Sequence, residues 1–227
     1  MFGFLKRKPA PKPLEIRDTL FGDRPLTQFL RIGPEALAGE PWASFGRVRA
    51  FMDAYNSKAA TATLFEILSM PRLESRMALQ AWHILRELGE QPPVELEKQV
   101  LGVVVEVGLP QGLDLVAGYA DHRARYFNLS GAGVVWECPS NALDEAIDNL
   151  LKVGSLVVRT IGPWRDARPP APVNGNARLN MLTPSGIHFG EGPMDALSND
   201  TAAGAILGSA LRLMQLLIEM NRAAPAN

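Results

Sequence analysis

The densest run of side chains that could do chemistry lies between Tyr119 and Glu137, in YADHRARYFNLSGAGVVWE. The polar residues of this run that could contact a ligand or a partner are Asp121, His122, Arg123, Arg125, Tyr126 and Glu137. A carboxylate beside an imidazole can move protons, and arginines can bind anions. The competing interpretation is an ordinary turn, because Asp starts turns readily and arginines cover exposed faces. Both interpretations stay open, and the sequence favours the turn.

Nucleophilic catalysis needs a serine whose hydroxyl meets a histidine and an acid, and Ser130 and Ser185 are the serines closest to His122 and His188. Neither serine stands in a G-x-S-x-G elbow. The three histidines and the single Cys138 show no spacing typical of metal ligands. We therefore predict no catalytic residue, no metal and no cofactor, and the sequence favours a non-enzyme while leaving the question open.

Two further segments carry candidate contacts. Residues 163–176 contain four prolines together with Trp164 and Arg165, which predicts an irregular surface connection with an aromatic ring on it. Such a ring either folds back onto the core or meets a partner. The run GIHFGEG places His188 and Glu191 near the end of a strand, but it lacks the Lys and Ser/Thr of a phosphate loop.

The charge of the chain is distributed unevenly along its 227 residues. Lysines and arginines number 23 against 24 acids, for a formal net charge of −1. Residues 1–13 hold four basic residues and no acid, so the remainder carries −5. Nucleic acid is an improbable partner for such an acidic body, even with the basic and aromatic side chains of 123–127.

The amino-terminal tail could touch an anionic membrane surface weakly. Its apolar and basic side chains are Phe2, Phe4, Leu5, Lys6, Arg7 and Lys8. The competing interpretation is a solvated tail. The basic residues follow the apolar ones, whereas in a secretory signal they would precede a long apolar run. No stretch of 18 apolar residues indicates a membrane span, and a single cysteine allows no internal disulfide. We therefore expect a cytoplasmic protein without a membrane span.

Helical periodicity runs from Pro34 to about Gly89. Apolar residues from Trp42 to Tyr55 recur at three- and four-residue steps, which predicts a helix whose apolar stripe faces the core, and a second helix follows Ser57. Pro71 is expected to open a third helix, which Gly89 ends. The helices around Pro71 resemble one helix pair of a HEAT-type repeat over about thirty residues, without a second copy.

Strand patterns begin beyond Pro92-Pro93. Runs at 101–107, 113–120, 124–129 and 133–138 are separated by short breaks that suit hairpins. A helix follows Asn141, a hairpin spans 177–190, and a last helix begins near Asn199. This order predicts an α+β fold: an N-terminal helical region, then a mostly antiparallel ββββ-α-ββ-α sheet with helices packed on one face as a two-layer sandwich. In layout it is similar to profilin.

We predict a flexible basic tail over 1–14, a helical region over 15–93 and an α+β sandwich domain over 94–227. The leading hypothesis for function is a non-catalytic adaptor that binds another protein through the sheet and its loops. The first alternative is a small-molecule-binding protein or hydrolase centred on the 119–137 region. The second alternative is a peripheral membrane protein anchored by its tail. Oligomeric state is left open by the sequence.

Overall fold

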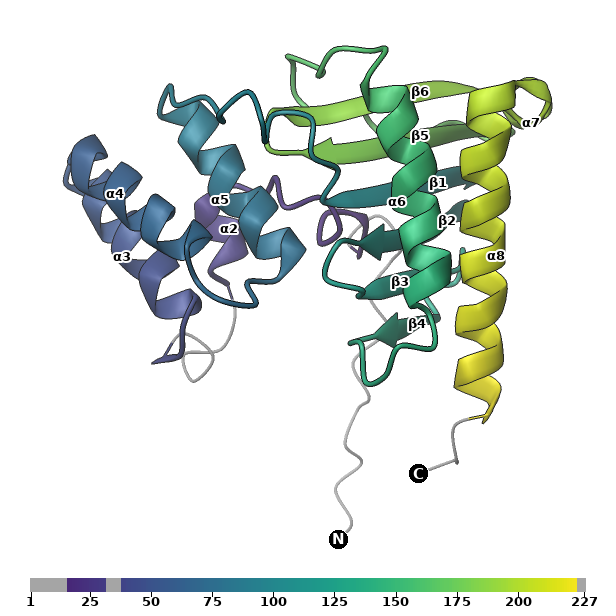
Figure 1. The fold of residues 1–227 in the computed structure, drawn as a ribbon, viewed down its shortest axis with the longest axis horizontal. Helices are drawn as coiled ribbons and strands as arrows, with labels where there is room; N and C mark the ends of the chain where they lie inside the picture. The colour runs from purple at the N-terminus through teal and green to yellow at the C-terminus, as the bar shows by residue number, and fades with distance from the viewer. Residues whose placement is uncertain (1–15, 32–37, 224–227) are drawn as a thin grey trace, which may run out of the picture.

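The computed structural model describes residues 16–31 and 38–223. The predicted basic tail and its candidate membrane contacts lie outside the described residues. Within them the order is four helices, four strands, one helix, two strands and two helices (Figure 1). The elements are α2 (Leu26–Phe29), α3 (Trp42–Asp53), α4 (Ser57–Leu68), α5 (Ser75–Glu87), β1 (Gly102–Leu109), β2 (Gly112–Tyr119), β3 (Ala124–Phe127), β4 (Gly133–Trp136), α6 (Asp144–Val158), β5 (Asn176–Thr183), β6 (Gly186–Pro193), α7 (Met194–Asn199) and α8 (Thr201–Ala223).

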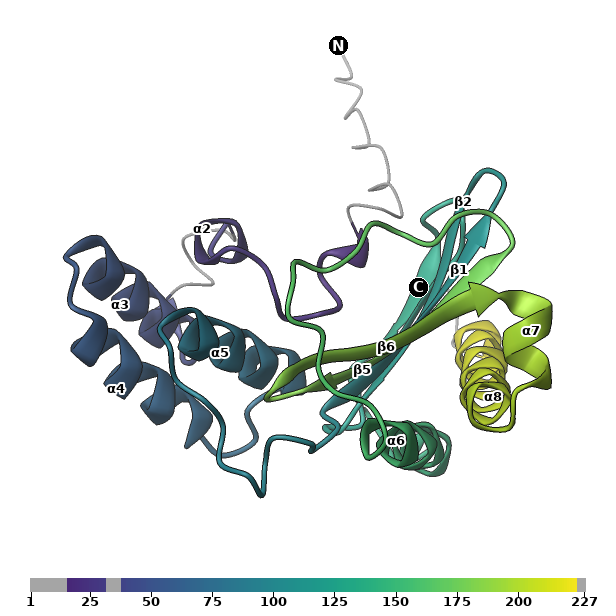
Figure 2. The same cartoon turned by 90° about the horizontal axis from the view of Figure 1, so that it is seen from above.

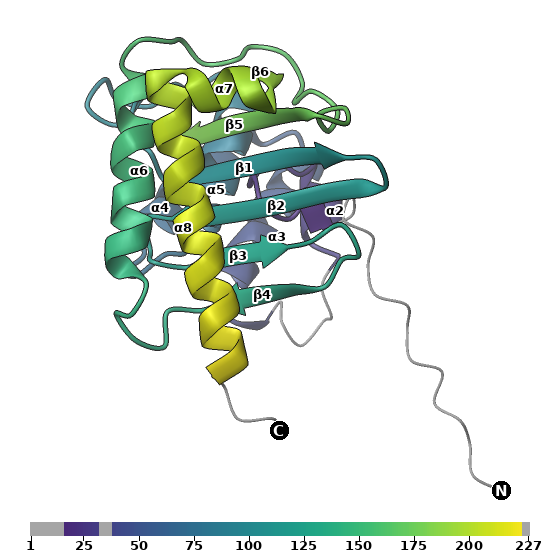
Figure 3. The ribbon, with the colours of Figure 1, turned by 90° about the vertical axis from the view of Figure 1, so that its right-hand side faces the viewer.

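The six strands form one antiparallel sheet in the order β4-β3-β2-β1-β5-β6. Helices α6 and α8 lie side by side across one face of this sheet (Figure 3). The predicted α+β class, with a helical part followed by the sheet and helices packed on it, is confirmed. The short helix α7 is an addition to the predicted order, placed between β6 and α8.

Alternation along β1 divides the core between the two faces of the sheet. Val103 and Val105 point to the α6 and α8 side and join its apolar core, whereas Val104 joins the core on the opposite side. The same alternation places Glu106 on that opposite side, where its side chain is fully buried. A charged residue inside a buried strand requires partners on this second face.

The second face of the sheet is covered by two irregular segments. Residues before α2 and the proline-rich connection after α6 both run over it (Figure 2). Leu20 and Phe21 are buried against Val104 and Tyr119, and the Tyr119 hydroxyl donates to the Leu20 carbonyl oxygen at 2.8 Å. Residues that the sequence analysis assigns to the helical region thus complete the core of the sheet. The division of the chain into domains at residue 93 stays a prediction.

Helices α3, α4 and α5 enclose an apolar core of their own. Two sequence expectations about this region are wrong. Pro71 does not open the third helix, because Arg72 has a φ of 58° and cannot belong to a helix. Helix α5 therefore begins at Ser75. Tyr55 follows the end of α3 with a φ of 54° and is 96% exposed instead of facing the core. The expected glycine at the end of the third helix is confirmed, since Gly89 has a φ of 92°.

Helix α8 is, within the described ranges, the one helix long and apolar enough to cross a membrane, over Thr201–Arg222. This criterion considers length and composition only, and the core helix of a soluble protein also meets it. In the 18-residue window that meets the criterion 28% is buried, and the buried side chains of the helix include Ile206, Leu213 and Leu217. The expectation of no membrane span therefore stays a prediction.

Candidate functional site

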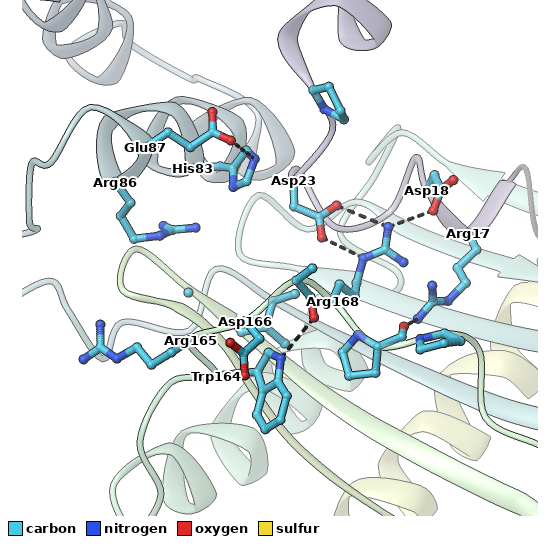
Figure 4. A pocket seen from close by; sticks show the side chains of 16 residues that line it. Arg17, Asp18, Asp23, His83, Arg86, Glu87, Trp164, Arg165, Asp166 and Arg168 are labelled. Carbon is cyan, nitrogen blue, oxygen red and sulfur yellow. Dashed lines mark hydrogen bonds and ion pairs between the residues drawn. The ribbon is translucent and has the colours of Figure 1, made fainter.

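A cleft of about 710 Å³ lies between α5, the segment before α2, the connection after α6 and the β5–β6 turn (Figure 4). Most of its lining is charged or aromatic. These side chains are Arg17, Asp18, Asp23, His83, Arg86, Glu87, Trp164, Arg165, Asp166 and Arg168. The cleft is formed where the helical part of the chain meets the second face of the sheet.

A buried ion network holds the base of the cleft together. The Arg17 guanidinium pairs with both carboxylate oxygens of Glu106 and also donates to the Pro169 carbonyl oxygen at 2.9 Å. Arg178 lies 3.5 Å from the same carboxylate and pairs with Glu191 on the neighbouring strand. Strand β1 thereby fixes the segment before α2 to the proline-rich connection.

Arg168 joins the connection to the segment before α2. Its guanidinium donates to Asp23 at 2.6 Å and to Asp18 at 2.7 Å, and it lies over the Phe21 ring at 4.2 Å. These carboxylates keep the pKa of Arg168 above its ordinary value despite the opposing effect of burial. Its Nη1 atom is buried and has no hydrogen-bond partner within the described part of the chain.

Helix α5 contributes His83, Arg86 and Glu87 to the cleft. The His83 imidazole lies 3.5 Å from the Glu87 carboxylate, and burial lowers the pKa of His83. Arg86 donates to the Pro184 carbonyl oxygen in the β5–β6 turn. Burial lowers the pKa of Arg86 to about 10, so the group still carries its charge at neutral pH. Among the described residues no carboxylate lies within ion-pair distance of Arg86.

Trp164 and Arg165 form the opposite wall. The Trp164 indole is 44% exposed, packs edge-on to Phe189 at 5.3 Å and donates to the Ala167 carbonyl oxygen at 3.1 Å. The ring therefore folds back onto the sheet in part and stays partly exposed along the cleft, and its contact with a partner stays a prediction. Arg165 is exposed and makes no ion pair within the described ranges.

The residues predicted between 119 and 137 are placed elsewhere. Arg123 pairs with Asp121 at 2.9 Å and with Glu137 at 2.8 Å. Arg125 pairs with the same Glu137, and its side chain is 4% exposed, so the interpretation of Arg125 as an exposed turn residue is wrong. Asp121 also accepts from the Ser75 N–H at the start of α5, at 2.9 Å. This network joins the β2–β3 turn to the helical part, which is a structural use of these charges.

The other candidate residues are also engaged within the fold. His122 has a φ of 59° and lies 2.9 Å from Asp148 on α6. Tyr126 is 3.5 Å from Asp114. His188 is buried, with Nδ1 at 3.1 Å from the Ile161 carbonyl oxygen and Nε2 at 3.4 Å from the Ser185 hydroxyl.

Of the ten candidate residues, the structure therefore places two, Trp164 and Arg165, in the charged cleft. The sequence analysis missed its remaining charged residues because they are distant along the chain. One signal was available: Glu106 interrupts the apolar run LGVVVEV, and a buried acid implies a buried cation beside it.

The lining offers guanidinium groups, carboxylates, one imidazole and one indole ring. Its described side chains include no hydroxyl, thiol or amine nucleophile. No group of three or more His, Cys, Asp and Glu side chains is placed to hold a metal ion in the described part of the chain. Guanidinium donors beside an aromatic surface suit recognition of a planar or acidic group.

A second, apolar groove of about 470 Å³ lies between α8, α7 and the first two strands. Its lining includes Val105, Val107, Leu207 and Met214, with Asp114 as the one charged side chain. Gly208 borders it, and a Cβ added there would meet no atom within 4 Å.

Comparison with known protein families, with curated proteins and with solved structures found no match to this chain. The structure itself defines the class: an α+β protein with a charged cleft on the second face of its sheet.

Proposed function

We propose that this chain is a non-catalytic protein-binding module whose partner docks in the charged cleft. The observation that carries the proposal is the combination of a half-exposed Trp164 with Arg165 and Arg86, neither of which makes an ion pair within the described ranges. Trp and Arg are the residues most enriched where protein interfaces concentrate their binding energy. The described lining holds no hydroxyl, thiol or amine nucleophile, so covalent catalysis by such a group is not supported there.

The alternative of a small-molecule or hydrolase site at 119–137 is less well supported. Its charged groups satisfy one another through the ion pairs of Arg123 and Arg125. Binding a ligand there would require these pairs to break. The cleft, in contrast, presents guanidinium groups that are still available.

The test is affinity capture of partners with the full chain immobilised. The double variant Trp164→Ala/Arg165→Gln removes the two exposed cleft contacts. Its matched control, Tyr55→Ala/Arg222→Gln, removes an exposed aromatic ring and an exposed arginine away from the cleft. Circular dichroism and thermal unfolding verify that each variant folds.

We expect the wild-type chain and the control to recover the same stoichiometric partner, and the cleft variant to lose it. Loss of an interface residue of this kind costs about 2 kcal/mol or more, roughly a 30-fold change in affinity. A partner that binds all three proteins equally, or no stoichiometric partner for any of them, contradicts the proposal.

A further inference from the structure

The apolar groove beside α8 lies on the face of the sheet opposite to the charged cleft. Helix α8 crosses this face with α6 on one side of it and the β1–β2 turn on the other (Figure 3). The groove lies toward that turn, since Val107 and Asp114 pair with each other two positions from the strand ends that form it. Leu211 lines the groove and is 51% exposed, so apolar surface is open there within the described part of the chain.

Asp114 is the one charged side chain that lines this groove among the described residues, and no lysine or arginine lines it there. The carboxylate accepts hydrogen bonds from the Leu129 N–H at 2.8 Å and from the Tyr126 hydroxyl at 3.5 Å. Both donors are neutral, and Asp114 makes no ion pair within the described ranges. An occupant that complements the groove is therefore apolar and carries a cation next to its apolar side chains.

The chain itself contains a segment with this composition. Phe2, Phe4 and Leu5 stand directly before the three basic residues 6–8, and no acid occurs in residues 1–13. The other segments outside the described residues, 32–37 and 224–227, contain no lysine or arginine. A segment on a short tether is present at an effective concentration of about millimolar, so that even weak contacts with the groove are sufficient to hold it.

The tether between this segment and the described structure is long enough to reach the groove. Arg17 pairs with Glu106 on the second face of the sheet, and Glu106 alternates along β1 with Val105 and Val107, which line the groove on the other face. A path around the β1–β2 turn between these faces is roughly 25 Å, from a layer spacing of about 10 Å and a rise of about 3.3 Å per strand residue. Residues 6–15 can extend to about 33 Å.

We infer that residues 2–8 of this chain dock in the apolar groove, with the apolar side chains of Phe2, Phe4 and Leu5 against α8 and a basic side chain of 6–8 beside Asp114. This inference goes beyond the proposed function and does not depend on it, because the groove and the charged cleft lie on opposite faces of the sheet. It also assigns the candidate membrane contacts of the tail to a surface of the protein itself.

The experiment is photo-crosslinking of the full chain with p-benzoylphenylalanine in place of Phe4, followed by mass spectrometry of the linked peptides. Irradiation at low and at high protein concentration separates links within one chain from links between copies. Leu211→Asp places a charge in the groove, and its matched control is Leu156→Asp, because Leu156 is 53% exposed on α6 and does not line the groove. Asp114→Asn removes the charge and keeps an oxygen acceptor for the Leu129 N–H. Circular dichroism verifies that each variant folds.

We expect links within one chain to the groove, at Met194 on α7 or Met214 on α8, at both protein concentrations. Leu211→Asp should lower their yield about tenfold, since a charge among apolar side chains costs that much or more. Asp114→Asn should lower it roughly threefold, the usual effect of losing a partly exposed ion pair. Leu156→Asp should leave the yield unchanged.

A second measurement uses the neutral apolar dye Nile red and needs no crosslinker. The full chain with Phe2→Ser, Phe4→Ser and Leu5→Ser should bind more dye than the wild type, because the groove is then open. Adding Leu211→Asp to that variant should remove the increase.

Links that are spread over the surface, or no links at all, overturn the inference. Links that appear only at high concentration overturn it as well, because the groove then receives a second copy of the chain. A groove yield that is equal in Leu211→Asp and Leu156→Asp has the same consequence. None of these results bears on the proposed function, whose test uses variants of the cleft alone.

Discussion

Replacing Glu106 by Gln should destabilise the protein more than neutralising any charged residue that lines the cleft. The Glu106 side chain is fully buried, and it accepts two hydrogen bonds from Arg17 and one, at 3.2 Å, from the Asn180 amide. Arg178 lies 3.5 Å away. Glutamine has the same shape, but its NH₂ group would face guanidinium donors.

The expected loss is about 3–5 kcal/mol, the usual consequence of removing one member of a buried ion pair. The side chains of Arg17 and Arg178 are 8% and 4% exposed, so water cannot replace the lost carboxylate at either. Of the two, Arg178 keeps Glu191 as a partner, whereas Arg17 has no second carboxylate partner among the described residues and keeps the Pro169 carbonyl oxygen. A typical domain has about 5–15 kcal/mol of stability in total, so the effect is easily measured.

The assay is urea unfolding followed by circular dichroism, with the midpoint and slope fitted for each variant. Glu191→Gln is the matched control, because the Glu191 side chain is 26% exposed and its partner Arg178 keeps the Glu106 carboxylate at 3.5 Å. We expect the control to lose about 1 kcal/mol or less. A loss below about 1 kcal/mol for Glu106→Gln would refute the assignment of this carboxylate as the counter-charge of two buried arginines.

Three further outcomes follow from the packing and the buried histidine. Gly208→Ala should stabilise α8 by up to about 1 kcal/mol, because the added Cβ meets nothing within 4 Å and alanine favours a helix. Gly154→Ala should instead destabilise the protein by about 1–3 kcal/mol, since its Cβ would lie 2.9 Å from a Val103 side-chain atom. A Gly154→Ala variant that melts at a higher temperature than Gly208→Ala would be inconsistent with this packing. Burial lowers the pKa of His188 below 6.5, so the unfolded chain binds more protons and the free energy of unfolding should fall as the pH drops below about 6.5. His188→Gln should make that decline shallower by up to about 1.4 kcal/mol per pH unit, and an unchanged slope in urea titrations from pH 7 to 5 would contradict it.

Much of the fold could be predicted because its signals are local. The β-branched run LGVVVEV and the helical stripes are patterns of neighbouring residues, so the element order was recoverable. Strand order was not: β5 pairs with β1 and not with β4, and that choice depends on contacts between residues far apart in sequence. The start of the third helix near Arg72 and the direction of Tyr55 were predicted wrongly, because both residues have a positive φ and neither residue type favours that conformation.

The candidate site was less predictable for the same physical reason. Trp164 and Arg165 stood out because an aromatic ring among prolines is conspicuous. Arg86 resembles any arginine in the last turn of a helix, and only its burial against the β5–β6 turn distinguishes it. The 119–137 run stood out as well, yet its charges neutralise one another, so density of polar residues in sequence did not indicate availability.

The segment before α2 belongs to both the sheet and the cleft, which ties the stability of the fold to the shape of the proposed site. Arg17 reaches Glu106 across 89 positions, and Arg168 reaches Asp18 across 150. Both contacts are made by residues 16–24, whose apolar side chains also cover Val104. The walls of the cleft therefore form only when these distant parts of the chain are packed together. A change that loosens the segment should weaken binding at Arg165 even though it touches no contact residue, and binding should in turn protect the segment from proteolysis.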